Sequence, residues 1–113
     1  MTAEQRLRDR GLELPAVAKP VGAYVPAVRS GGFVFTAGQL PLRDGLLAGS
    51  GKVPSEVPLA DAQQAARLAA MNALAAARSV LGSLDLVEQV VRVNVFVNSA
   101  AGLTNTFAKG VAV

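Results

Sequence analysis

Cysteine, histidine and tryptophan are absent from this 113-residue sequence, and tyrosine occurs only once. Without cysteine there is no disulfide bond and no thiolate nucleophile. Without histidine the commonest general base and the usual zinc and transition-metal ligands are missing. We therefore expect no metal site and no chemistry that depends on either side chain. Four Phe and one Tyr also leave few rings on which nucleic-acid bases could stack.

Long apolar runs are missing as well. A membrane-spanning helix needs about 18 or more consecutive apolar residues, but the alanine-rich run from position 65 to 77 is interrupted by Arg67 and Asn72. The first eight residues mix both charges and lack the apolar centre of a signal peptide. From these features we expect no membrane partner and a cytoplasmic location.

Charge of one sign is not concentrated anywhere. Eleven Lys and Arg against eight Asp and Glu give a net charge of +3, and the cations are scattered along the chain. Only Arg6, Arg8 and Arg10 cluster, in a segment whose pattern predicts a short helix. We read that cluster as a solvated helix face rather than a phosphate-binding patch, and expect no nucleic-acid partner.

What is present is a composition typical of one small globular domain, which we assign to residues 1–113. The chain is 51% hydrophobic and 17% charged. Local patterns predict a helix over residues 2–10 closed by Gly11, then a hairpin of residues 24–29 and 33–37 around two glycines. Pro26 cannot donate a hydrogen bond to its neighbour strand, which indicates an edge position or a bulge there.

The segment from residue 40 to 58 is the least regular, with a turn signal at Asp44-Gly45. Its Gly49-Ser50-Gly51-Lys52 stretch superficially resembles a phosphate-binding loop. Such a loop needs a glycine at the position of Leu46 and a hydroxyl residue at that of Val53, so we interpret the stretch as a flexible loop.

The second half of the chain predicts a long amphipathic helix followed by a strand. The helix covers residues 59–81 and ends at Gly82. Its expected buried stripe comprises Ala62, Ala65, Ala66, Ala69, Ala73, Leu74, Ala77, Val80 and Leu81. From position 91 to 98, valine alternates with other residues, which predicts a strand whose valine face meets the alanine stripe. Thr104 is a candidate cap for a further helix.

Two segments together resemble a known family. Residues 21–41, VGAYVPAVRSGGFVFTAGQLP, pair two apolar runs across a glycine turn and end in a compact corner, TAGQLP. Residues 91–98, VRVNVFVN, follow a long helix and a Gly-x-Leu-x-x-Val connector from Gly82 to Val87. The chain resembles the Rid family, also called the YjgF family, over about its whole length. The resemblance implies an α/β (α+β), chorismate-mutase-like fold, a mixed sheet with helices packed on one face. It also implies a homotrimer with clefts between its subunits.

The resemblance implies an activity too, the hydrolysis of 2-iminobutanoate or 2-iminopropanoate to the 2-keto acid and ammonia. No cofactor is expected, since the imine is already electrophilic. Residue by residue, the matching cleft positions are Tyr24, Ala37, Gly38 and Gln39, with Gln39 expected to brace the corner. Many family members carry serine where this chain has Ala37. Without the resemblance, Tyr24 is equally well read as a strand residue with a solvated hydroxyl. Gly38 and Gln39 are then equally well read as a tight turn that binds nothing.

The family's substrate-binding arginine and a late glutamate fall beyond Val113, so no catalytic residue is assigned and the final helix and strands are expected to be missing. We therefore expect this chain to hydrolyse an imine hardly faster than water does. Arg92 is the strand arginine that would have to replace the missing one, and Asp85 and Glu88 are read as solvated or capping. One alternative is a non-catalytic trimeric module, either structural or binding a small metabolite or a protein through the remaining cleft. The other, ranked last because histidine is absent and few rings can stack on bases, is an endoribonuclease.

Overall fold

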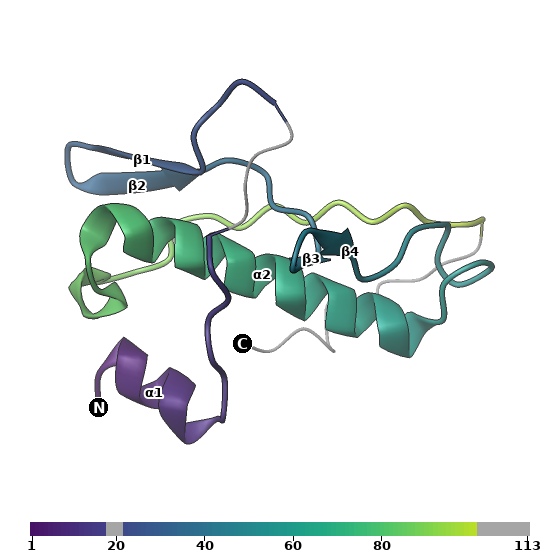
Figure 1. Ribbon diagram of the computed structural model, residues 1–113, viewed down its shortest axis with the longest axis horizontal. Coiled ribbons are helices and arrows are strands. Elements are labelled where there is room, and N and C mark those ends of the chain that lie inside the picture. Colours follow the sequence, from purple (N-terminus) through teal and green to yellow (C-terminus); the bar gives the residue numbers. More distant parts are fainter. Residues whose placement is uncertain (18–21, 102–113) are drawn as a thin grey trace.

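The computed structural model describes residues 1–17 and 22–101, and its long helix α2, Leu59–Leu81, runs through the middle of the molecule (Figure 1). Ten alanines from residue 60 to 77 favour this helix, because alanine has the highest helix propensity. It ends at Gly82, whose φ of 85° lies where other residues are strained and whose N–H donates to the Arg78 carbonyl at 2.7 Å. The predicted bounds of the helix are confirmed.

The predicted hairpin is present, with a later start. Strands β1, Ala27–Ser30, and β2, Phe33–Thr36, pair antiparallel, with Ala27 opposite Thr36 and Ser30 opposite Phe33. Gly31 turns the chain at a φ of 58°. The first strand begins at Ala27 and not at Tyr24, since the preceding Pro26 has no N–H; its carbonyl still accepts from Ala37 N–H at 2.8 Å.

A second, smaller hairpin follows. Strands β3, Leu42–Arg43, and β4, Leu46–Leu47, pair antiparallel around Asp44 and Gly45, with φ of 53° and 79°. Two consecutive residues with positive φ are the mark of a type I′ hairpin turn, and Asp-Gly is a favoured sequence for it. The sequence predicted this turn but not the two short strands beside it.

The N-terminal helix α1, Ala3–Asp9, lies on the opposite side of α2 from the hairpins (Figure 1). Thr2 caps it by accepting from Gln5 N–H, and the Gln5 side chain accepts from Thr2 N–H in return. Gly11, at a φ of 68°, follows its end, as predicted. The helix packs against the single-turn 3₁₀ helix η1, Leu84–Leu86, which follows α2.

The buried face of α2 is not the predicted stripe. Of the nine predicted positions only Ala62 is buried; the buried residues of the helix are Ala62, Leu68, Met71, Asn72, Ala75 and Ala76. Alanine occupies every side of this helix, so its periodicity does not select one face. The larger side chains Leu68 and Met71 are buried, and the helix as a whole packs against the hairpins β1–β2 and β3–β4.

The strand predicted at residues 91–98 is not formed within the described residues. Within the described residues, positions 91–97 are extended but have no strand partner. The expected valine face does not meet the alanine stripe, because Val91, Val93 and Val95 are 72%, 71% and 60% exposed. Period-two alternation places side chains on two faces but does not supply the neighbouring strand that must accept the backbone hydrogen bonds.

The extended segment is tied to the molecule at its far end. Val53 N–H donates to the Asn98 carbonyl at 2.8 Å, and Ala100 N–H donates to the Val53 carbonyl at 2.7 Å, which makes a parallel bridge between Val53 and Ser99. Val53 itself is buried. The proposed cap at Thr104 lies outside the described residues.

Candidate functional site

The corner segment, which we define as residues 36–41, is held by backbone and side-chain hydrogen bonds. Ala37 N–H donates to the Pro26 carbonyl at 2.8 Å, which ties the start of the corner segment to the chain two residues beyond Tyr24. The Gln39 side-chain amide donates to the Ala37 carbonyl at 3.2 Å and closes the turn over Gly38. Gln39 thus braces the corner, the role that the sequence interpretation gave it.

The end of the corner segment is fastened to α2. Leu42 N–H donates to the Leu40 carbonyl at 2.8 Å across Pro41. The side-chain Nδ2 of Asn72 donates to the carbonyls of both Leu40 and Leu42, at 3.0 Å each. Sequence reasoning missed Asn72, which it treated only as an interruption of the alanine run.

Gly38 has open space beside its backbone. A side chain built there would meet no heavy atom of the described residues within 4 Å. Ala37 and Gln39 on either side are half-buried, whereas Gly38 is exposed. A small ligand could therefore approach the main chain at Gly38 without moving a side chain.

Tyr24 is 46% exposed, and its ring folds back over its own segment. Its N–H donates to the Gly22 carbonyl at 3.0 Å, and its ring would lie 2.9 Å from a β-carbon built on Gly22. None of the side-chain hydrogen bonds between described residues involves the phenol, so it is available to a ligand or to water. The structure thus places the segments of Tyr24 and Ala37 beside each other.

These four residues carry no charge. Arg92, the arginine considered for a carboxylate contact, is exposed on the extended segment. Asp85 caps, as one of its two interpretations predicted: its Oδ1 accepts from Glu4 N–H, at 2.9 Å, at the start of α1. Within residues 1–17 and 22–101 no group of three acidic, histidine or cysteine side chains is arranged to hold a metal ion.

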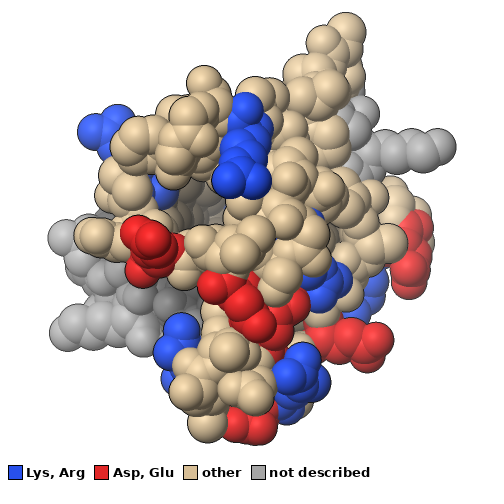
Figure 2. Space-filling model, turned by 90° about the vertical axis from the view of Figure 1, so that its left-hand side faces the viewer, with Lys and Arg blue, Asp and Glu red and all other residues tan. Residues whose placement is uncertain are grey.

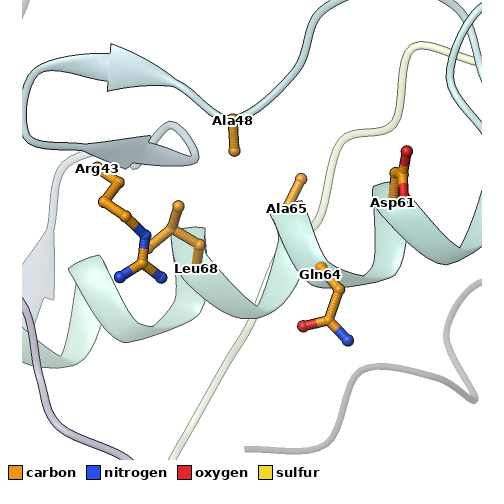
Figure 3. A pocket seen from close by; sticks show the side chains of 6 residues that line it. All are labelled: Arg43, Ala48, Asp61, Gln64, Ala65 and Leu68. Carbon is orange, nitrogen blue, oxygen red and sulfur yellow. The ribbon is translucent and has the colours of Figure 1, made fainter.

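A hollow of about 220 Å³ lies elsewhere, between the β3–β4 hairpin and the first half of α2 (Figure 3). Its lining consists of Arg43, Ala48, Asp61, Gln64, Ala65 and Leu68. Arg43 extends toward the helix, while Asp61 and Gln64 point in different directions from it (Figure 3). None of the predicted site residues lines this hollow, so it is separate from the corner segment.

Charges of both signs are mixed on the end of the molecule that carries the β1–β2 turn and α1. Figure 2 shows blue and red side chains interspersed there, with no continuous basic area on that face. Among the described residues, no helix has the length and apolar character needed to cross a lipid bilayer.

Helices combined with small antiparallel strand pairs define an α/β protein, and comparisons with known proteins give the family. The sequence pattern of the family described as "YjgF/chorismate_mutase-like, putative endoribonuclease" matches residues 4–107. The chain therefore belongs to this YjgF family, the one that its sequence resembles.

Individual relatives agree with that assignment. The chain is 38% identical over 98 residues to Protein TCP17 of Trypanosoma cruzi, covering 87% of this chain and 61% of that protein. It is similar to a crystal structure described as "a putative endoribonuclease" from Shewanella oneidensis, at 37% identity and a TM-score of 0.69, over 74% of this chain and 56% of the other. The Agrobacterium tumefaciens protein Atu1372, of unknown function, gives a TM-score of 0.81 at 35% identity, over 96% of this chain and 68% of that protein.

Two conclusions follow from these relatives. The expected α/β, chorismate-mutase-like fold class is confirmed, since the similarity to Atu1372 covers 96% of the chain. The chain also spans less than two thirds of the length of the first two relatives, 61% and 56%.

Proposed function

We propose that the protein to which this chain belongs hydrolyses 2-imino acids to 2-keto acids and ammonia, with Tyr24 and the corner segment as part of the substrate site. The observation that carries the proposal is the open main chain at Gly38, held beside the Tyr24 segment by the 2.8 Å bond between Ala37 N–H and the Pro26 carbonyl. The reaction class is the one that the resemblance to the Rid family implies.

Hydrolysis of an imine requires few groups from the protein. Water adds to the electrophilic imine carbon, ammonia leaves, and the carbonyl of the keto acid forms, so neither an oxidant nor a cofactor is required. The phenol of Tyr24 can orient the water or the imine nitrogen with one hydrogen bond. Free main-chain groups around Gly38 can hold the substrate close to it.

The substrate carboxylate needs a cationic partner, because a charge-assisted hydrogen bond to it contributes roughly 1.5–3 kcal/mol. Tyr24, Ala37, Gly38 and Gln39 are all neutral. We therefore propose that the cation comes from outside these four residues, and that the cleft forms between subunits of a homotrimer.

The test is keto-acid release from 2-iminobutanoate generated in situ, measured with the whole protein to which this chain belongs over a range of protein concentrations. A rate above that of buffer, lowered roughly tenfold by Tyr24→Phe and unchanged by Ser55→Ala at an exposed loop, supports the proposal. Saturable binding of 2-oxobutanoate without any rate would instead indicate the non-catalytic module. Cleavage of RNA by a nuclease-free preparation would replace the proposal with the activity in the family's description.

A further inference from the structure

Asn72 is the one described polar side chain that is completely buried, with 1% of its surface exposed in the middle of α2. A carboxamide nitrogen has two hydrogens, and both are used here, one on the Leu40 carbonyl and one on the Leu42 carbonyl, each at 3.0 Å. Because both partners are acceptors, the nitrogen must face them, and the orientation of the amide is fixed by chemistry.

The other end of the same amide is not satisfied. Oδ1 is buried and has no hydrogen-bond partner among the described residues. A buried acceptor without a partner is unfavourable, so this side chain is poorly suited to a purely stabilising role. An apolar side chain of similar volume would fill the same space without that cost. Unlike an apolar side chain, asparagine provides two donors here, and they bind the carbonyls of Leu40 and Leu42.

The two carbonyls bound by Asn72, those of Leu40 and Leu42, lie on either side of Pro41. Leu40 directly follows Gln39, the last residue of the proposed substrate site. At its other end the corner segment is held through Ala37 and Pro26. Gly38 lies between these two fixed ends, and Gln39 is bonded only to Ala37 inside the segment. The position of the Gly38 main chain is therefore set from one side by the hairpin and from the other side by α2.

We propose that Asn72 is a positioning residue: its amide fixes the conformation of the corner segment from α2, and so fixes where the ligand-binding main chain at Gly38 lies. The consequence for ligand binding rests on the proposed function; the effect on the conformation of the corner segment does not. Asn72 touches no substrate in this arrangement and acts only through Leu40 and Leu42.

Asn72→Leu tests the proposal, because leucine keeps the branched shape and the number of heavy atoms of the side chain and removes both donors. We expect the backbone amide resonances of residues 37–42 to move, with β1 and α1 resonances unchanged. Affinity for 2-oxobutanoate, followed by the same spectra, should fall about tenfold, as for loss of a geometry-setting hydrogen bond. Leu84→Val is the matched control, since it trims a buried side chain in η1, which packs against α1 and α2, and removes neither hydrogen bond of Asn72. It should leave both the 37–42 resonances and the affinity unchanged.

The wild-type protein provides a second measurement that does not require the variant to fold. The side-chain amide protons of Asn72 should exchange slowly with water and shift when 2-oxobutanoate is added, unlike those of exposed Gln64. Rapid exchange of the Asn72 amide protons, or a folded Asn72→Leu with wild-type resonances at residues 37–42, overturns the inference. If the wild-type protein does not bind 2-oxobutanoate, the proposed function fails, while the resonances of residues 37–42 in Asn72→Leu still decide the conformational role.

Discussion

Two carboxylates join the N-terminal helix to the region where α2 ends. The Glu4 carboxylate pairs with the Arg78 guanidinium at 3.1 Å, and Glu4 N–H donates to Asp85 Oδ1 at 2.9 Å. The two contacts differ in kind. The ion pair is formed by long side chains, one of them 40% exposed, whereas the Asp85 oxygen satisfies a free N–H in the first turn of α1.

We predict that Asp85→Ala loosens α1 more than Glu4→Gln does. Loss of the capping acceptor should cost about 1 kcal/mol, while loss of a partly exposed ion pair should cost less than about 0.5 kcal/mol. Hydrogen exchange of the α1 backbone amides measures both. Glu88→Ala removes a nearby exposed carboxylate and should change nothing. Equal effects of the first two variants would contradict the argument.

At the scale of single residues, the sequence indicated Gln39 as a brace and Asp85 as a possible cap, and the structure bears out both. It did not indicate Asn72. A buried asparagine in an alanine-rich helix has no periodic signature, and its partners Leu40 and Leu42 lie some thirty residues earlier in the chain. The assignments of Tyr24, Ala37 and Gly38 as ligand contacts stay predictions.

Among the elements, α2 determines the arrangement of the others, because both hairpins and η1 pack against it. Its length and ends were predictable, since alanine favours the helix and Gly82 ends it. Its buried face was not, because that face depends on which partners pack against the helix. The prediction of a strand at residues 91–98 was wrong for the same reason. A strand needs a neighbouring strand to pair with, and a local sequence pattern does not show whether one is present.

Ala75 and Ala76 are among the most completely buried residues of α2. Ala76 is 0% exposed and Ala75 is 2% exposed. We predict that Ala76→Leu destabilises the protein by about 1–3 kcal/mol, because a well-packed interior cannot accept the larger side chain without strain. Ala60→Leu, the same change at an exposed position of the same helix, should change the free energy of unfolding by less than about 0.5 kcal/mol. Urea unfolding distinguishes them, and similar midpoints for the two variants would show that Ala76 is not tightly packed.

The end of α2 gives a second prediction at this scale. Gly82 adopts a φ of 85°, and a β-carbon there would meet no atom within 4 Å. Gly82→Ala should therefore destabilise the protein through its backbone conformation and not through a clash with neighbours. We expect the free energy of unfolding to fall by about 1–2 kcal/mol. Gly49→Ala, where space is equally open and φ is not positive, should be neutral or slightly stabilising. Thermal unfolding of the two variants checks this, and a Gly82→Ala protein as stable as Gly49→Ala would exclude the argument from φ.

Over the whole molecule, apolar side chains are distributed unusually for an isolated domain. The extended segment exposes a series of valines, and Phe96 is 93% exposed. On the β1–β2 hairpin, Val28, Phe33 and Phe35 are 50%, 54% and 60% exposed. Contiguous exposed apolar surface is typical of a protein interface, and a strand without partners leaves its backbone hydrogen-bonding groups free as well.

We therefore predict that the chain self-associates, with the extended segment at residues 90–97 in the contact. Sedimentation velocity over a range of concentrations should show a species larger than the monomer at micromolar protein, and a trimer if the proposed family assembly holds. Phe96→Asp should weaken the association at least tenfold, since it places a charge where an apolar ring would be buried. Asn94→Asp introduces the same charge two residues away at a position that is already polar, and should have a much smaller effect. A monomer at every concentration would refute self-association, and equal weakening by the two variants would mean that net charge, rather than burial of Phe96, controls the contact.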